Sequence, residues 1–200
     1  MKNLRALYYR MHYNSIIIGP KVQPCDRRGK MEESKCCGCP YGCCSGEDAA
    51  VKAICVEYLY LDLEDCGRCS DTFLALGEAI REARMVFEGS GITISIAPVK
   101  VESQQQAIEL RFSASPTIRM NGRDICEAVT ETRCEQCCSQ CGSDVTCRVW
   151  RLRGQTYDSA PKALIIDALI RAAYSPQPAA GADEEFTLPE NLRKFFSGRR

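Results

Sequence analysis

Histidine is nearly absent from this 200-residue chain, which contains one, His12. Ser-His-Asp and Cys-His catalytic sets, histidine-rich zinc sites and two-histidine iron sites all need imidazole within the folded body. His12 lies ahead of the segments that we expect to fold. The sequence therefore excludes these classes of site, and any chemistry must proceed without imidazole.

Long apolar runs and a strong net charge are also lacking. The longest apolar stretch near the start is Ile16–Ile18, whereas about 18 apolar residues would be needed to span a bilayer. The 26 Lys and Arg residues balance 26 Asp and Glu residues. No basic patch interleaved with aromatic residues indicates a nucleic-acid surface. We therefore expect a cytoplasmic protein that has neither a membrane nor a nucleic acid as its partner.

Cysteine is abundant, with 15 residues in the chain. Since 45% of the residues are hydrophobic, a chain of this length can bury a core without disulfide bonds to hold it together. In a reducing cytoplasm, closely spaced cysteines are more often redox-active or metal-binding than structural. We therefore expect the cysteines to carry the chemistry.

Hydrophobic periodicity predicts an α/β domain with a mixed central sheet flanked by helices. The expected order is strand, helix, strand, short helix, strand, strand, helix, at residues 51–63, 66–88, 92–98, 102–110, 115–120, 148–157 and 161–174. The third strand enters a tight turn at Asn121-Gly122. An amphipathic stretch at 188–196 either docks on the domain or is offered to a partner.

Composition divides the chain into segments. We expect residues 1–30 to be a basic leader that is disordered or, if translation starts at Met31, not translated. Residues 31–50 form a cysteine-rich segment, and 51–175 form the α/β domain, with a cysteine-rich insertion at 126–147 before the last core strand. Residues 176–200 contain a linker and a short C-terminal helix.

A Cys-x-x-Cys pair, Cys66 and Cys69, lies at the junction between the first strand and the first helix. The unpaired N–H groups and the dipole of a helix N-terminus favour a thiolate at the first cysteine. We therefore expect Cys66 to be a nucleophile and Cys69 to be the resolving thiol. Arg68 adds a stabilising positive charge, while Asp65 opposes ionisation.

In this region the chain resembles the thioredoxin superfamily, because a strand precedes the pair, a helix follows it, and Ser115-Pro116-Thr117 comes about fifty residues later. The resemblance implies a thioredoxin-like fold, with a cis Ser115–Pro116 bond packed against the pair and Pro116 shaping a substrate groove. The chain departs from the family pattern at Asp65, where tryptophan is usual, and in the Gly-Arg between the cysteines. Substrate and reduction potential are therefore not carried over.

Later segments resemble a bacterial and archaeal family, domain of unknown function 2703, which has a thioredoxin-like core. The resemblance covers about Ile54 to Phe196 and rests on residues 115–125, 147–150, 160–169 and 188–196. It implies the fold and no particular reaction.

Two further cysteine clusters are candidate metal sites. The first supplies five thiols, enough for a four-thiolate zinc site or an iron–sulfur cluster, and comprises Cys134, Cys137, Cys138, Cys141 and Cys147. A third possibility is a pair of disulfides that relays electrons to and from Cys66 and Cys69. A zinc-stapled loop with no role in turnover fits as well as these functional sites together. The second cluster could capture soft ions or be a tail of reduced thiols, and comprises Cys36, Cys37, Cys39, Cys43 and Cys44.

Two functional hypotheses follow. In the first, the protein is a thiol–disulfide oxidoreductase that acts through Cys66 and Cys69 on a protein disulfide or thiol, with an external electron donor. In the second, the fold is a scaffold for a thiolate-rich site that binds a thiophilic metal or metalloid. Zinc and an iron–sulfur cluster are the candidate cofactors, and the sequence establishes neither.

Overall fold

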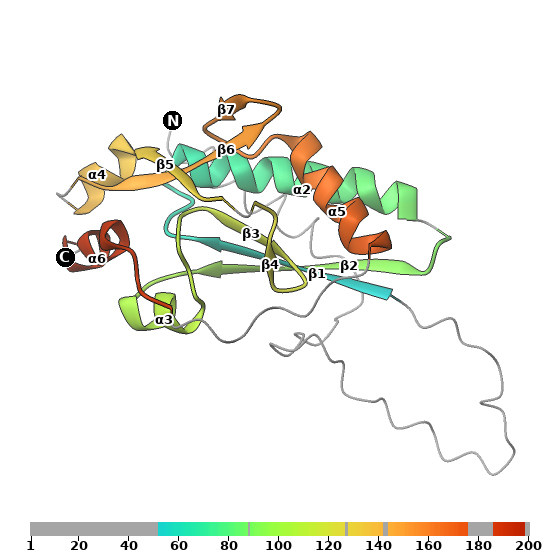
Figure 1. Cartoon of the computed structure of the whole chain (residues 1–200), viewed down its shortest axis with the longest axis horizontal. Coiled ribbons are helices and arrows are strands. Elements are labelled where there is room, and N and C mark those ends of the chain that lie inside the picture. Colours follow the sequence, from blue (N-terminus) through green and yellow to red (C-terminus); the bar gives the residue numbers. More distant parts are fainter. Residues whose placement is uncertain (1–51, 88, 127, 142–143, 176–185, 199–200) are drawn as a thin grey trace, which may run out of the picture.

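The computed structural model describes residues 52–87, 89–126, 128–141, 144–175 and 186–198 (Figure 1). The predicted leader at 1–30 and the cysteine-rich segment at 31–50 lie outside the described residues. The second candidate cluster is therefore not described, namely Cys36, Cys37, Cys39, Cys43 and Cys44. In the described part of the chain, no helix is both long and apolar enough to cross a membrane.

A four-stranded mixed sheet lies at the centre, in the order β2-β1-β3-β4. Strand β1 (Lys52–Tyr60) pairs in parallel with β2 (Ile92–Lys100) and antiparallel with β3 (Thr117–Met120). Strand β3 turns back into β4 (Arg123–Asp124). Asn121 and Gly122, which connect them, have φ angles of 51° and 78°, as the predicted tight turn requires.

Helices cover both faces of this sheet (Figure 1). Helices α2 (Gly67–Phe87) and α5 (Lys162–Tyr174) pack side by side on one face. Helices α3 (Gln104–Glu109) and α6 (Glu190–Gly198) lie on the other. The chain thus has the predicted mixed sheet flanked by helices, and residues 188–196 dock on the domain.

Successive side chains of β1 point to opposite faces of the sheet, so the strand contributes to one core on each face. Ile54, Val56 and Tyr58 are buried in the core beneath α2 and α5. Leu59, and Leu61 just beyond the strand, are buried in a second core with α3 and α6. The candidate site residues lie in this second core, at the end of the sheet where α2 begins.

A second, antiparallel sheet has the order β5-β6-β7, and its first strand and the start of its second lie in the insertion. It comprises β5 (Thr130–Arg133), β6 (Thr146–Leu152) and β7 (Gln155–Tyr157), with α4 (Glu135–Cys141) between β5 and β6. The prediction that 148–157 forms the last core strand was therefore wrong. The last strand of the central sheet is β4, and the insertion follows it.

The burial of β6 explains why it was predicted to be a strand of the central sheet. Residues 147–150 of β6 are buried on both faces, which is the pattern of a central strand. Strand β4 has two residues, too few to show any alternation. Arg148 fastens β6 to the central sheet, because its buried guanidinium donates to both carboxylate oxygens of Asp124 at 2.8 and 2.6 Å. Its backbone N–H also donates to the Ser115 carbonyl at 2.8 Å.

Candidate metal centre

Cys66 lies at the N-terminus of α2, as the sequence predicts. The Asp62 carboxylate accepts the backbone N–H groups of Glu64 and Asp65, both at 2.7 Å, and so turns the chain after β1. The Ser70 N–H donates to the Cys66 carbonyl at 3.0 Å, which begins the helix. The Cys66 side chain therefore lies where unpaired helix N–H groups favour a thiolate.

Three thiols of the insertion gather around the start of α4. Cys134 immediately precedes the helix, Cys137 lies in its first turn, and Cys147 is the second residue of β6. The Cys134 N–H donates to the Val145 carbonyl at 3.0 Å, and the Cys138 N–H donates to the Cys134 carbonyl at 2.9 Å. These backbone bonds bring the thiols to one end of the second sheet.

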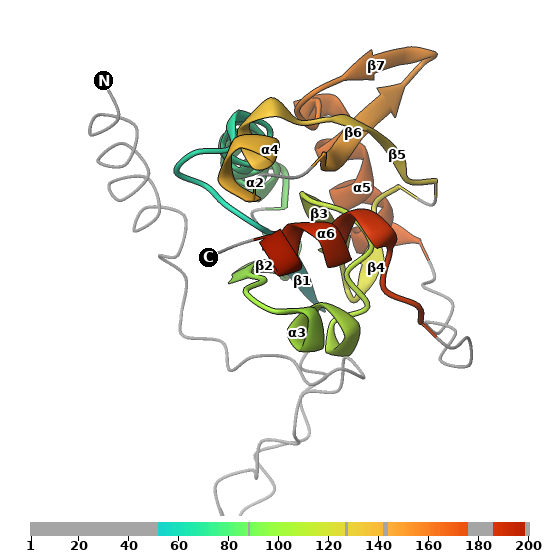
Figure 2. The same ribbon diagram turned by 90° about the vertical axis from the view of Figure 1, so that its left-hand side faces the viewer.

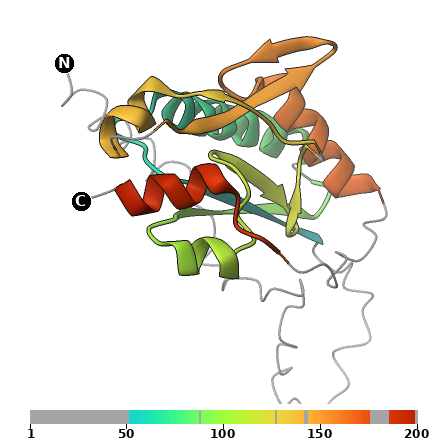
Figure 3. The same cartoon turned by 60° about the vertical axis from the view of Figure 1, so that its left-hand side comes forward.

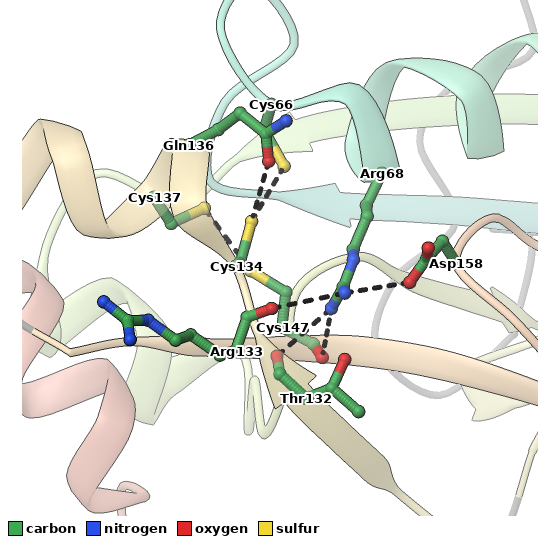
Figure 4. Close-up of polar contacts among 9 residues, drawn as sticks. All are labelled: Cys66, Arg68, Thr132, Arg133, Cys134, Gln136, Cys137, Cys147 and Asp158. Carbon is green, nitrogen blue, oxygen red and sulfur yellow. Dashed lines mark hydrogen bonds and ion pairs between the residues drawn. The ribbon is translucent and has the colours of Figure 1, made fainter.

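Cys66 and these three thiols form one four-sulfur cluster (Figure 4). The four Sγ atoms all lie within 4.8 Å of one another, and all four residues are buried. The Cys66 and Cys134 sulfurs are 4.0 Å apart, and the Cys137 and Cys147 sulfurs are 3.3 Å apart. The sequence placed Cys66 in one site and the other three in another, and the fold brings them together.

Cys69 lies beside this cluster and is not one of the four. It is fully buried in the same core as the cluster cysteines, and its Sγ lies 3.3 Å from the Ser115 hydroxyl oxygen. The Ser115 hydroxyl also accepts the Leu61 N–H at 3.1 Å. The predicted cis Ser115–Pro116 bond is confirmed, and Pro116 is buried.

Other candidate residues have different partners. Cys138 is half-buried, and its sulfur accepts the Val145 N–H at 3.1 Å. Cys141 ends α4, and its side chain is outside the description. The Asp65 side chain is exposed, and the Thr117 hydroxyl donates to the Ala114 carbonyl at 2.7 Å.

Arg68 has a role that the sequence did not indicate. Its guanidinium donates to the carbonyls of Thr132, Cys147 and Arg133 at 3.1, 3.2 and 3.2 Å and pairs with Asp158 at 2.8 Å (Figure 4). A planar guanidinium with five donors suits such a set of acceptors. Arg68 therefore clamps the start of α2 to β5 and β6, and holds Cys147 against Cys66.

Hydrogen bonding within the cluster favours ionisation of Cys66 and Cys134 over ionisation of Cys137 and Cys147. Hydrogen bonds from Cys134, Cys137 and Cys147 lower the pKa of Cys66. Hydrogen bonds from Cys137 and Cys147 lower the pKa of Cys134 to about 7, whereas Cys137 and Cys147 have raised pKa values because they donate within the cluster, first to Cys134. Four thiolates this close and this buried would repel one another strongly unless a cation lay between them.

Helix α6 lies between α4 and α3, on the side of the molecule where the insertion begins its second sheet (Figures 2 and 3). Leu192 and Phe195 are buried in the same core as the cluster cysteines. The Asn191 amide fastens the helix to the insertion, donating to the Glu131 carboxylate at 2.6 Å and to the Thr146 carbonyl and hydroxyl at 3.3 and 3.1 Å. The cover over the sulfurs therefore depends on a polar anchor as well as on apolar packing.

Asn191→Ala should loosen this cover. Losing partly buried hydrogen bonds worth about 1–2 kcal/mol should increase the fraction of molecules in which α6 is detached from the insertion. The alkylation rate of the reduced, metal-free cluster thiols should rise with it, about ten-fold. Mass spectrometry of iodoacetamide-treated protein measures that rate for each cysteine. Gln104→Ala is the matched control, because its amide makes an exposed contact with Ser197 on the same helix. Equal rates in both variants would contradict the role of Asn191.

Comparison with known proteins identifies a family but no characterised relative. No curated protein and no solved structure matches the chain. The family model described as Domain of unknown function (DUF2703) matches residues 54–169. This span is more than half of the chain and contains all four clustered cysteines. The chain therefore belongs to the family of domains of unknown function DUF2703.

Proposed function

We propose that this protein binds one thiophilic metal ion, with Zn²⁺ the best fit, through Cys66, Cys134, Cys137 and Cys147. The observation that carries the proposal is the set of four buried sulfurs within 4.8 Å of one another. Because the ligands are all sulfur, the site favours zinc, copper(I) or iron over hard cations such as Mg²⁺.

The sulfur separations suit a single ion. A Zn–S bond of about 2.3 Å places tetrahedral ligands about 3.8 Å apart. The 4.0 Å between Cys66 and Cys134 and the 3.3 Å between Cys137 and Cys147 lie on either side of this value. An iron–sulfur cluster spreads four cysteines over two or four irons with sulfides between the irons, which needs a wider cage. The geometry therefore favours one ion over a cluster.

The burial and charge of the four cysteines favour a site that holds a metal ion over a site that catalyses a reaction at the metal. Zinc sites with four protein ligands are closed, whereas catalytic sites keep a position for water. A divalent ion would offset two of four thiolate charges, and Arg68 adds a positive charge beside the site. Binding must displace the thiol protons, so affinity should fall as the pH falls. A reducing cytoplasm would keep these thiols available.

A second candidate function is thiol–disulfide exchange. It is favoured by Cys66 at the start of α2, with Cys69 buried three residues later in the same core and Ser115 and cis Pro116 beside Cys69. The mixed sheet flanked by helices supports the thioredoxin-like fold that such an activity would use. Cys66 would attack a substrate disulfide, Cys69 would resolve the mixed disulfide, and a cellular electron donor would restore both thiols.

Single cysteine substitutions test the metal centre. Each of the variants Cys66→Ser, Cys134→Ser, Cys137→Ser and Cys147→Ser should bind one equivalent less Co²⁺ or Zn²⁺ than the full-length parent, because three thiolates hold the ion too weakly. The cobalt charge-transfer and d–d absorption of a four-thiolate site should be lost with it. Cys138→Ser and Cys69→Ser are the controls and should keep both. If Cys66→Ser keeps the full metal content and spectrum, the proposed ligand set is wrong.

Arg68→Lys tests the clamp. Lysine keeps the charge but cannot span three carbonyls, so the cluster should lose its fixed geometry. Removing such outer contacts lowers metal affinity about 10–100-fold, and we expect a loss at the lower end, measured by competition with a zinc chelator. Arg151→Lys, at an exposed position on β6, should leave the affinity unchanged. Equal affinities for the two variants would show that Arg68 does not organise the site.

A further inference from the structure

Cys66 belongs to two sets of thiols that exclude each other. We propose that a disulfide substrate competes with the metal for the Cys66 sulfur, a proposal that rests on the metal centre proposed above. Exchange with a small disulfide would join Cys66 to Cys69 and release the ion. The protein would thereby convert a change in thiol–disulfide balance into metal release.

The structure places Cys69 to take Cys66 out of the cluster. It follows Cys66 by three residues at the start of α2 and is buried in the same core, although it is not one of the four clustered thiols. Helix geometry places Cα atoms three residues apart about 5 Å from each other, which is within the Cα separation that a disulfide spans, so a disulfide here needs little backbone movement. Cys66 can therefore change partner from the ion to Cys69 by a small rotation of its side chain.

The other thiols of the site are less suited to this exchange. Cys134, Cys137 and Cys147 would bind the same ion. A disulfide between any two of them would remove two ligands from the ion at once. The Cys138 sulfur faces the Val145 N–H and lies outside the cluster. A disulfide between Cys66 and Cys69 removes a single ligand from the ion, because Cys69 is not one of the four clustered thiols.

The exchange proceeds in two steps whose electrons balance. The Cys66 thiolate leaves the ion and attacks one sulfur of the substrate RSSR, which forms a Cys66–SR mixed disulfide and releases one RS⁻. Cys69 gives its proton to a base in solution, and its thiolate attacks the Cys66 sulfur, forming the Cys66–Cys69 bond and releasing the second RS⁻. Two thiols of the protein are oxidised, and one substrate disulfide is reduced to two thiols.

The access of the substrate disulfide to Cys66 should set the rate of the exchange. Cys66 is 1% exposed and Cys69 is 0% exposed, so a substrate disulfide reaches Cys66 only when the residues that cover the cluster move. Helix α6 is part of that cover and is anchored by Asn191. A variant with a looser α6 should therefore react faster and give the same product.

The test uses full-length protein loaded with Zn²⁺ and treated with oxidised glutathione, with a chromophoric chelator reporting free zinc. The parent should release one equivalent of zinc more than Cys69→Ser and should contain a Cys66–Cys69 disulfide in peptide maps. At the same glutathione concentration Cys69→Ser should release zinc at least about ten-fold more slowly, because its mixed disulfide is reversed by the released thiol. Cys138→Ser should match the parent, and Asn191→Ala should release zinc faster.

The outcomes separate the two proposals. If the parent and Cys66→Ser hold the same amount of zinc before oxidation, the metal centre itself is wrong, and the competition falls with it. If the zinc is bound by the four cysteines but stays bound after the Cys66–Cys69 disulfide has formed, only the competition is overturned. Release accompanied by a Cys137–Cys147 disulfide, or release that is equally fast in Cys69→Ser, also overturns it.

Discussion

Four buried sulfurs close enough to bind one ion are the constraint on which the rest of the site depends. Buried thiols this close cannot all be ionised unless a cation lies between them. Without a cation, some of them keep their protons and donate hydrogen bonds to the others. The surrounding structure serves to bring them together. The Asp62 turn sets Cys66 at the start of α2, Arg68 ties that helix to the insertion, and α6 covers the sulfurs.

The central sheet and the insertion contribute different parts of one centre. The sheet and α2 provide a rigid position for Cys66, and the insertion after β4 brings three further thiols to it. The two functional hypotheses therefore concern the same atom. A metal ion and a disulfide both need the Cys66 sulfur, and Cys69, held by Ser115 beside the cluster, is the alternative partner for it.

The elements with strong hydrophobic periodicity and the local motifs could be predicted from the sequence. Strands β1 and β2, helices α2, α3 and α5, and the cis Ser115–Pro116 bond lie where they were expected. The misplaced core strand came from β6, whose burial on both faces imitates a central strand. Spacing marked Cys134, Cys137 and Cys147, but it could not show that Cys66, 68 residues earlier, joins them. It also could not separate Cys137 from Cys138, because that depends on where α4 begins: neighbours on a helix point about 100° apart.

The most direct test of the central claim is anomalous diffraction at the zinc absorption edge from crystals of the zinc-loaded protein. Our account predicts an anomalous peak bonded to the sulfurs of Cys66, Cys134, Cys137 and Cys147, each at about 2.3 Å. A peak held by the insertion cysteines alone, with the Cys66 sulfur at van der Waals distance or beyond, would contradict it.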